Sequence, residues 1–373
     1  MIFNSLRTTS FRNLIDAEIN TNAKDVFLVG ENGQGKTNFL EAIYFCAYAS
    51  SFRAVRDTEI ARNNFNDDNA KSDNKNFSAE VKLSQSVNDQ ILIKFENEKK
   101  SIFINGKKAE DRKELLSIAP SIVFCHEDME FVSGSPERRR WFFDQTLSLY
   151  DPVYLEDFRR FRRVLKTRNS VLRNYAQKKL SEAVEPILDA LDPQIVMYGQ
   201  KIMEKREKAA HEFSQLFSSL YEEVSGIGGI TVRYIKSWKS DDILSHLQQR
   251  RLAELAAGLS LSGPHRDRYQ FAHNGNDFTI TASTGQRRLL ALLLRAAQAR
   301  RFSTETKQNP VLLLDDVLLE MDGEKRRRFV SVLPEYDQAF YTFLPEEPYQ
   351  RYQKDDTLVY TVENGCCKMK QQL

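Results

Sequence analysis

Residues 30–37 carry the clearest chemical signal in this sequence. They read Gly-Glu-Asn-Gly-Gln-Gly-Lys-Thr and match the pattern G-x-x-x-x-G-K-S/T in full. In such a loop the glycines let backbone N–H groups wrap closely around a phosphate, the lysine neutralises phosphate charge, and the hydroxyl ligates Mg²⁺. The candidate nucleotide-binding residues are Gly30, Glu31, Asn32, Gly33, Gln34, Gly35, Lys36, Thr37 and the following Asn38.

A phosphate-binding loop needs a strand before it and a helix after it. Residues 25–30 read DVFLVG, a short apolar run that predicts a buried strand ending in glycine. Residues 38–49 have apolar side chains at positions 39, 40, 43, 44 and 47, the spacing of one helical face. Both elements are in place, so the pattern favours a true phosphate site over a chance match in a glycine-rich turn.

A second apolar run, residues 312–314, delivers two aspartates to the end of a predicted strand. There Asp315 could hold Mg²⁺ through a water molecule, beside Thr37, and Asp316 could orient or deprotonate the attacking water. Asp316 and Lys36 are therefore the candidate catalytic residues, and Thr37 and Asp315 the candidate metal ligands. An aspartate in place of a longer glutamate predicts slow turnover. Taken alone, the run would equally suit a buried strand that ends in a solvated turn.

Residues 282–288, Ala-Ser-Thr-Gly-Gln-Arg-Arg, open an apolar helix about 30 residues before the aspartates. Ser283 can cap this helix, so that the Gly285 N–H and the helix dipole face an anion. The segment resembles the L-S-G-G-Q signature of ABC-class ATPases, although an ordinary capped helix is the alternative. In that class the signature completes the nucleotide site of a second subunit. The resemblance therefore adds Ser283, Gly285 and Gln286 to the nucleotide-binding candidates and places residues 320–322 at the D-loop.

The middle of the chain reads as helical. From Tyr154 to Tyr175 apolar side chains recur at steps of three and four, interrupted only by Arg168, and residues 195–224 repeat this pattern. Pro186 and Pro193 lie between the two runs, where we expect the helices to end. The interpretation is an arm of two long helices joined by a proline-containing turn. An ordinary helical bundle is the alternative.

This middle region is also basic. Between residues 135 and 179 there are twelve Lys and Arg against five Asp and Glu, a local charge of +7, whereas the whole chain carries +2. Such a surface suits the phosphate backbone of DNA and does not read sequence. A solvated helix face is the alternative, although it would interleave more glutamates. The candidate DNA-binding residues form a stripe beside the apolar face: Arg159, Arg163, Lys166 and Arg173.

Shorter segments carry a family resemblance. Residues 10–13 (Ser-Phe-Arg-Asn), 51–53 (Ser-Phe-Arg) and 263–267 (Gly-Pro-His-Arg-Asp), in order with the three motifs, resemble the RecF family of bacterial recombination-repair ATPases, which are related to SMC proteins. The resemblance implies an α/β fold, an ABC/SMC-type P-loop ATPase head with an inserted helical arm domain. The expected domains are residues 1–128, the N-terminal half of the head; 129–255, the arm; and 256–373, the C-terminal half.

The same resemblance implies a function. It predicts a homodimer that forms with ATP and Mg²⁺, binds double-stranded and gapped or junction DNA, and helps to load RecA with RecR and RecO as partners. It also predicts a slow, DNA-stimulated ATPase that acts as a switch. Arg12 would reach the nucleotide, unless it is a surface arginine, and Thr342 is the candidate γ-phosphate switch where many ABC ATPases have histidine. His265 is expected to be a structural histidine.

Composition bounds the remaining possibilities. The chain has 373 residues, of which 41% are hydrophobic and 28% charged, as in a soluble globular protein. No apolar run approaches the ~18–20 residues of a membrane helix, and the four cysteines show no framework spacing, so a cytoplasmic protein without a membrane partner is expected. Two rival functions stay open. They are a transport-type ABC subunit and a structural SMC-like clamp that uses ATP only for assembly.

Overall fold

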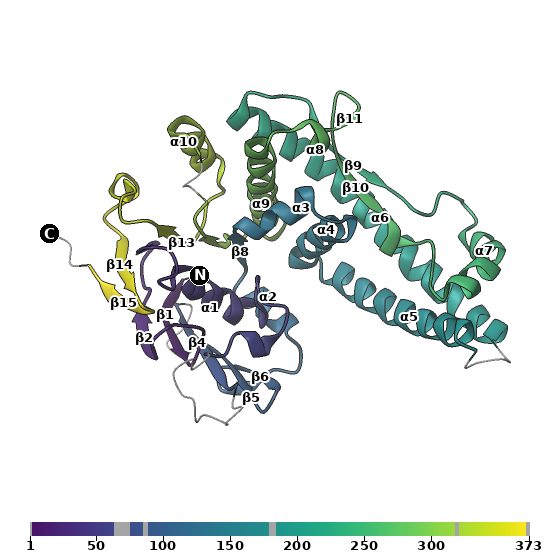
Figure 1. Cartoon of the computed structure of the whole chain (residues 1–373), viewed down its shortest axis with the longest axis horizontal. Helices are drawn as coiled ribbons and strands as arrows, with labels where there is room; N and C mark the ends of the chain where they lie inside the picture. The colour runs from purple at the N-terminus through teal and green to yellow at the C-terminus, as the bar shows by residue number, and fades with distance from the viewer. Residues whose placement is uncertain (1, 63–74, 85–88, 179–183, 318–320, 371–373) are drawn as a thin grey trace. The chain divides into compact units, whose positions relative to one another are not determined.

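The chain folds into two compact units. The computed structural model describes residues 2–62, 75–84, 89–178, 184–317 and 321–370. Unit 1 comprises Met1–Asp128 together with Phe302–Leu373, and unit 2 comprises Met129–Arg301. Figure 1 follows the chain through both units by colour. The first division falls after Asp128, and the expected domain boundary at that residue stays a prediction. The compact unit 2 continues to Arg301, so the assignment of residues 256–301 to the head stays a prediction.

Unit 1 contains two six-stranded sheets. The first has the order β15-β14-β3-β13-β12-β8, in which every neighbouring pair is parallel except β14 and β15. Its strands are β3 (Asp25–Val29), β8 (Ser121–Phe124), β12 (Val311–Leu314), β13 (Gln338–Phe343), β14 (Thr357–Glu363) and β15 (Cys366–Met369). β3, β8, β12 and β13 are buried along their whole length, as expected for parallel strands covered on both faces.

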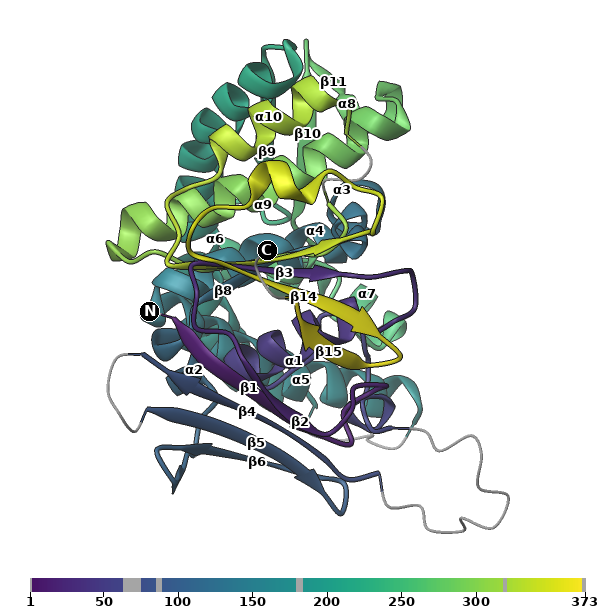
Figure 2. The same cartoon turned by 90° about the vertical axis from the view of Figure 1, so that its left-hand side faces the viewer.

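The second sheet of unit 1 is antiparallel, with the order β2-β1-β4-β5-β6-β7. Its strands are β1 (Phe3–Thr9), β2 (Ala17–Asn20), β4 (Phe77–Leu83), β5 (Gln90–Glu96), β6 (Lys99–Ile104) and β7 (Lys107–Lys108). Figure 2 shows β1, β2, β4, β5 and β6 side by side beneath β3 and β14. α1 (Lys36–Tyr48) contacts strands of both sheets and is almost entirely buried. The remaining helices of this unit are α2 (Lys113–Ile118) and α10 (Gly323–Val332).

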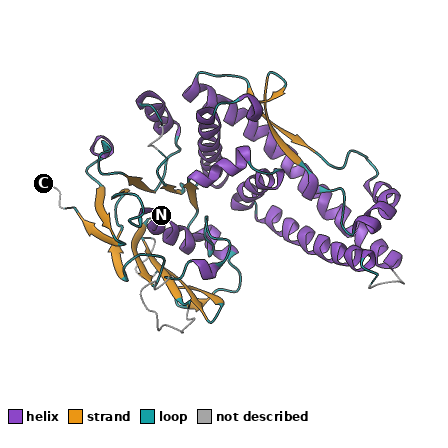
Figure 3. Ribbon diagram, in the orientation of Figure 1, coloured by secondary structure: helices purple, strands orange, loops and turns teal. Residues whose placement is uncertain are grey.

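Unit 2 is mainly helical, as the colours of Figure 3 show. It also has a small antiparallel sheet of β9 (Ile230–Ile235), β10 (Arg268–His273) and β11 (Asn276–Asp277). Its helices are α3 (Glu130–Ser133), α4 (Pro136–Tyr150), α5 (Pro152–Ala176), α6 (Val184–Ser225), α7 (Ile243–Ala257), α8 (Phe278–Thr281) and α9 (Thr284–Thr306), whose end belongs to unit 1. Within the described ranges, no helix is both long and apolar enough to span a bilayer.

α5 and α6 are the two long helices that the sequence pattern predicts, and they pack side by side. α5 begins where expected because Asp151 caps it, accepting a hydrogen bond from the Tyr154 N–H at 2.8 Å, with Pro152 in its first turn. The expectation that helices end at the two prolines is wrong. α6 begins at Val184 and runs for 42 residues through Pro193.

The physical reason differs between the two prolines. Pro186 lies in the first turn of α6, where a backbone N–H has no helical acceptor, so its missing donor costs nothing. Pro193 lies inside the helix and does remove a hydrogen bond. On either side of it, Asp192 and Ile195 are buried, so tertiary packing offsets a local penalty of about 3 kcal/mol.

Unit 2 contains two fully buried arginines. Arg168 on α5 forms ion pairs with Asp192 and Glu254, at 2.8 and 2.7 Å. Arg206 on α6 pairs with Asp144 at 2.8 Å and Asp267 at 3.2 Å. Buried charges are stable only when paired and hydrogen-bonded, and both arginines meet this condition. The Arg168 ion pairs join α5 to α6 and α7, and the Arg206 ion pairs join α6 to α4 and to the loop residue Asp267.

Candidate functional site

The phosphate-binding loop lies between β3 and α1, where the sequence predicts it. Gly33 and Gly35 have φ angles of +78° and +116°, a region that side chains with a Cβ rarely adopt. A Cβ on Gly35 would also lie 2.9 Å from Asn13 Oδ1, and one on Gly30 would lie 2.3 Å from the Val362 carbonyl oxygen. Gly33 is needed for its φ angle alone, since a Cβ there would meet no atom within 4 Å, whereas Gly30 and Gly35 also let the loop pack closely against Val362 and Asn13.

The loop is braced by segments distant in sequence. The Gly365 N–H donates to the Gln34 carbonyl oxygen at 2.8 Å, and the Asn364 N–H donates to Gln34 Oε1 at 2.6 Å. On the other side Asn13 accepts from Asn38 Nδ2 at 2.6 Å and donates to the Gly33 carbonyl oxygen at 3.3 Å. The turn between β14 and β15 thus holds Gln34, whereas Asn13 holds Gly33 and Asn38.

The charged group of the loop points inward. Lys36 is buried, and its ammonium donates to the carbonyl oxygens of Gly30 at 2.6 Å and Glu31 at 3.1 Å. Glu31 and Asn32 are exposed. The ammonium therefore lies over the loop, at the place where phosphate charge would be neutralised.

The two predicted metal ligands are in direct contact. Thr37 Oγ1 donates to Asp315 Oδ1 at 2.9 Å. This contact follows from the fold, because β3 and β12 both flank β13 and deliver their carboxyl ends to one edge of the sheet. A hydroxyl beside a carboxylate is the oxygen pair that Mg²⁺ prefers, so the residues fit this ion.

The electrostatics of Asp315 also suit a cation. Its carboxyl group is surrounded by protein although the residue keeps some exposure, and burial together with the adjacent Asp316 raises its pKa to about 7. The Thr37 hydrogen bond and Arg53 oppose this rise in pKa. A site that destabilises its own negative charge in this way favours a positive ion.

A buried carboxylate lies one helical turn behind the loop. Glu41 on α1 accepts two hydrogen bonds from Arg12, at 2.9 and 2.8 Å, and one each from Ser51 and Arg53. Burial raises its pKa, but Arg12, Arg53 and Ser51 outweigh that effect and hold it below the ordinary value. Arg12 is thus held beside the loop, and Arg53 reaches the loop end through Asn38 Oδ1. Whether Arg12 contacts nucleotide stays a prediction.

The signature-like segment lies in unit 2, where Ser283 and Gln286 form two reciprocal hydrogen bonds at the N-terminal end of α9. The Gln286 N–H donates to Ser283 Oγ at 3.3 Å, while Gln286 Oε1 accepts from the Ser283 N–H at 2.7 Å. This reciprocal pair is a capping box. Gly285 is exposed, and a Cβ there would meet no atom within 4 Å. Of the expected D-loop, Glu320 lies outside the described residues, whereas Asp322 caps α10.

The Gly-Pro-His-Arg-Asp segment makes hydrogen bonds and an ion pair within unit 2. His265 Nε2 lies 3.1 Å from the Ser260 carbonyl oxygen, and burial together with nearby arginines lowers its pKa to about 4 despite that hydrogen bond. The lowered pKa favours the neutral imidazole, which contacts the loop at Ser260, and the structural role of His265 stays a prediction. Asp267 is buried, pairs with Arg206, and accepts hydrogen bonds from the Tyr234 hydroxyl and the Ser237 N–H.

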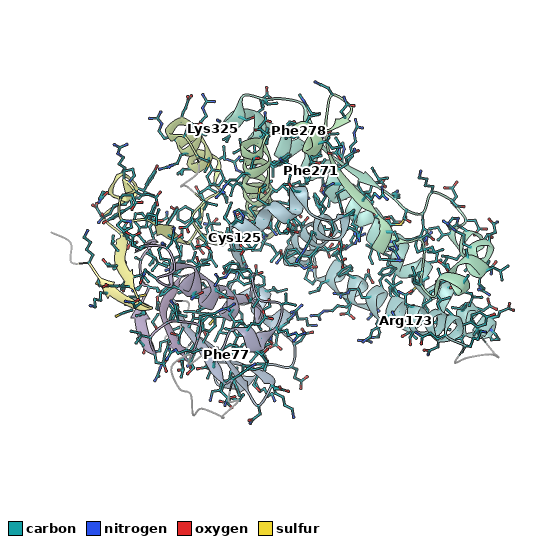
Figure 4. All side chains as sticks on the ribbon, viewed as in Figure 1. Phe77, Cys125, Arg173, Phe271, Phe278 and Lys325 are labelled. Atoms are coloured by element: carbon teal, nitrogen blue, oxygen red, sulfur yellow. The ribbon has the colours of Figure 1, made fainter. Side chains whose placement is uncertain are left out.

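Three of the four residues of the basic stripe on α5 are exposed, and their contact with DNA stays a prediction. Arg163, Lys166 and Arg173 are exposed, whereas Arg159 is half-buried; Arg173 is labelled in Figure 4 near the C-terminal end of α5. Burial does not reduce the local excess of positive charge, because Arg168 and two acidic residues of the same window, Asp144 and Asp157, are all buried. Arg168 is neutralised by two carboxylates that lie outside the counted window, and Lys179 lies outside the described residues.

Sequence reasoning missed three residues of the site. Asn13 and Arg53 stood in segments that carried the family resemblance, but no role followed from their positions. Glu41 lies among the apolar residues of α1, and no role was inferred for it from the sequence. A carboxylate four residues after Thr37 on a buried helix is itself a signal, because a buried carboxylate needs cationic partners.

These features together define a P-loop ATPase of the ABC/SMC type. They are the phosphate loop between a strand and a helix, the two aspartates after a nearby parallel strand, and the capped signature-like helix. A sequence model described as "RecF/RecN/SMC N terminal domain" matches residues 2–368. The chain is 41% identical to the DNA replication and repair protein RecF of Treponema pallidum (strain Nichols) over 361 residues, 96% of this chain and 98% of that one. It is 30% identical to RecF of Staphylococcus aureus (strain JH9) over 378 residues, 98% of this chain and 99% of the relative.

Solved structures agree on the fold. The recombination mediator protein RecF-ATP of the RecFOR pathway matches with a TM-score of 0.86 at 24% identity, covering 99% of this chain and 98% of that one. An Smc head bound to the C-terminal winged-helix domain of ScpA matches with a TM-score of 0.55 at 15% identity, covering 99% and 98%. The chain belongs to the RecF family of DNA replication and repair proteins, within the SMC-like ATPases.

Proposed function

We propose that this chain binds ATP and Mg²⁺ at residues 30–37, forms a homodimer around the nucleotide, and binds double-stranded and gapped or junction DNA. Slow hydrolysis, stimulated by DNA, would reverse the association. In the cell the protein would help to load RecA at gaps with RecR- and RecO-type partners, as its family membership suggests. The observation that carries the proposal is the Thr37–Asp315 contact, because it joins the loop and the aspartate strand into one site.

The chain's own residues divide the work. The loop N–H groups and Lys36 bind the phosphates, and Thr37 with Asp315 would hold Mg²⁺, which supplies charge neutralisation at the β- and γ-phosphates. Asp316 orients the attacking water and accepts its proton. Asp316 is short for this task, which is consistent with a protein that works more as a switch than as a metabolic catalyst.

The capped end of α9 supports association through nucleotide. The capping box uses the side chains of Ser283 and Gln286 and leaves Gly285 open to solvent. An exposed helix N-terminus binds anions through its backbone N–H groups and its dipole. The proposed anion is the γ-phosphate held by a second copy of the chain.

The stripe on α5 supports contact with DNA. Arg163, Lys166 and Arg173 are exposed on one helix and could contact successive phosphates of a backbone. Such contacts position a protein on DNA without reading bases, so we propose recognition of DNA shape rather than of sequence.

Sedimentation tests these proposals together. The protein would be compared with ATP, with ADP and without nucleotide, each with and without gapped duplex DNA. We expect a dimer with ATP only, and tighter association on DNA. Lys36→Ala should abolish the ATP-driven dimer. A dimer that forms equally well without a working loop would refute the nucleotide-dependent association and favour a structural protein whose assembly does not need ATP.

The DNA contact needs its own variant and control. Alanine at Arg163, Lys166 and Arg173 should weaken DNA binding and flatten its salt dependence by up to about three counterions, whereas alanine at the exposed Lys99, Lys107 and Lys108 of unit 1 removes the same charge elsewhere. Equal losses in both variants would refute a specific role for the stripe. Phosphate release with and without DNA then distinguishes a DNA-stimulated ATPase from a clamp that uses ATP only for assembly.

A further inference from the structure

The hydroxyl group of Thr342 lies within hydrogen-bonding distance of both Asp315 and Asp316. Thr342 is on β13, the strand between the loop strand β3 and the aspartate strand β12, and is aligned with Leu28 of β3. Its side chain is buried, with 4% of its surface exposed. Thr342 Oγ1 lies 2.7 Å from the Asp316 backbone nitrogen, 2.8 Å from Asp316 Oδ1 and 3.3 Å from Asp315 Oδ1.

The hydrogens at this point can be counted. A threonine hydroxyl has one hydrogen to donate and two lone pairs that accept. The Asp316 N–H donates to Oγ1, and the hydroxyl hydrogen goes to the nearer carboxylate oxygen, Asp316 Oδ1, in preference to the more distant Asp315 Oδ1. The hydroxyl therefore holds the backbone and the side chain of one residue at once.

Asp316 needs this support. Its φ angle is +51°, in the left-handed region that costs energy for any residue with a Cβ, although aspartate tolerates it better than most. β-Branched side chains have few χ1 states, and a buried one on a central strand is fixed further by packing. Thr342 thus supplies a rigid acceptor for the N–H of a strained turn and a rigid donor for its carboxylate.

We propose that Thr342 is a positioning residue for Asp316, setting the direction of the carboxylate that orients the attacking water. The assignment rests on the proposed function, since it presumes that Asp316 acts on ATP. It differs from a direct contact between Thr342 and the γ-phosphate. At neutral pH, phosphate oxygens act mainly as hydrogen-bond acceptors. Thr342 has a single hydroxyl hydrogen, and it is already donated to Asp316. A phosphate contact would release the carboxylate that hydrolysis needs.

Two substitutions separate these roles. Thr342→Val has nearly the same shape but neither donates nor accepts, whereas Thr342→Ser keeps the hydroxyl. In Thr342→Val we expect the kcat of DNA-stimulated ATP hydrolysis to fall about tenfold or more, because a misplaced catalytic group loses that much or more. The affinities for ATP and ADP should stay within about twofold, and Thr342→Ser should restore most of the rate. Thr357→Val is the matched control. Thr357 is a buried threonine of the same sheet whose Oγ1 accepts from the Lys354 N–H at 2.9 Å.

A double substitution makes the test sharper. If Thr342 acts only through Asp316, then adding Thr342→Val to Asp316→Asn should lower the residual rate no further. Multiplicative losses would overturn the proposal. A loss of affinity for ATP but not for ADP in Thr342→Val would overturn it as well, since that result assigns the hydroxyl to the γ-phosphate.

A readout without nucleotide distinguishes failure of this inference from failure of the proposed function. The Asp316 amide hydrogen should exchange with solvent faster in nucleotide-free Thr342→Val, which has lost its acceptor, and at the normal rate in Thr342→Ser and Thr357→Val. Unchanged exchange in Thr342→Val would refute the positioning role even if the protein hydrolyses ATP. Faster exchange in a protein that shows no hydrolysis would instead leave Thr342 placed as described and refute the ATPase.

Discussion

Arg168 of α5 offers the sharpest test of how unit 2 is held together. Its side chain has no exposed surface, and it donates to Asp192 Oδ1 at 2.8 Å, Glu254 Oε2 at 2.7 Å and Ser260 Oγ at 2.7 Å. Replacing it with methionine keeps much of the volume and removes the charge. Two buried carboxylates would then lose their shared cation.

The expected loss follows from what remains. Removing one partner of a buried ion pair costs about 3–5 kcal/mol. Asp192 keeps Arg251 at 2.8 Å, and Glu254 keeps the Leu261 N–H at 2.8 Å, so the lower end of that range applies. We therefore expect Arg168→Met to lower the free energy of unfolding of unit 2 by about 3 kcal/mol. For a body of this size that loss corresponds to a fall in Tm of about 6–12 °C.

The chain provides its own probe for this measurement. Both of its tryptophans, Trp141 and Trp238, lie in unit 2, so fluorescence during urea unfolding reports on that unit. Arg173→Met on the same helix is the control, because an exposed arginine should change stability by no more than about 0.5 kcal/mol. A loss below about 1 kcal/mol in Arg168→Met, or one equal to that of the control, would refute the uncompensated-carboxylate argument.

Two further predictions concern pH. His265→Gln should make the stability of unit 2 less sensitive to acid. Folding lowers the pKa of His265 from 6.5 to about 4, so between these pH values the unfolded chain binds more protons than the folded chain. The folded protein therefore loses stability on the order of 3 kcal/mol as the pH falls from 6.5 to about 4. Urea midpoints of both proteins from pH 7 to 4 check this, and parallel curves would contradict it. Glu41→Gln should lower the Tm of unit 1 at neutral pH, because Arg12 and Arg53 lose their shared anion. The Glu41 pKa is depressed below 4.5, so this deficit should shrink as pH falls through the folded pKa. Calorimetry of both proteins measures it, and a deficit that grows with acid would sink the idea.

Local patterns predicted the elements of the site well. The strand at residues 25–29 is placed as expected, and the helix expected at residues 38–49 is α1, whose first residue is Lys36. These predictions worked because glycine geometry and apolar periodicity are properties of neighbouring residues. The order of motifs along the chain added the aspartate strand, which alone was ambiguous.

What the sequence could not supply were partners that meet only through the fold. Arg168 broke an otherwise regular apolar stripe, a visible sign of a buried charge, but its partners lie 24 and 86 residues away. Pro193 was expected to end a helix because local propensity was weighed without the packing of α6. Thr342 was expected to face phosphate; its two bonds to Asp316 depend on the register between parallel strands, which no short pattern encodes.

The strand order of the parallel sheet also determines when its strands can pair during synthesis on the ribosome. β3, which leads into the phosphate loop, pairs with β13 on one side and β14 on the other, and β8 pairs with β12. All three of those partners belong to the C-terminal part of the chain. At ~5–20 residues per second, a ribosome needs roughly 15–60 s to travel the distance between β3 and β13. During that interval two apolar strands of the nascent polypeptide have unpaired edges, which are hazards for aggregation. Chains released early would therefore be prone to aggregate, and holding by a chaperone until synthesis ends would protect them.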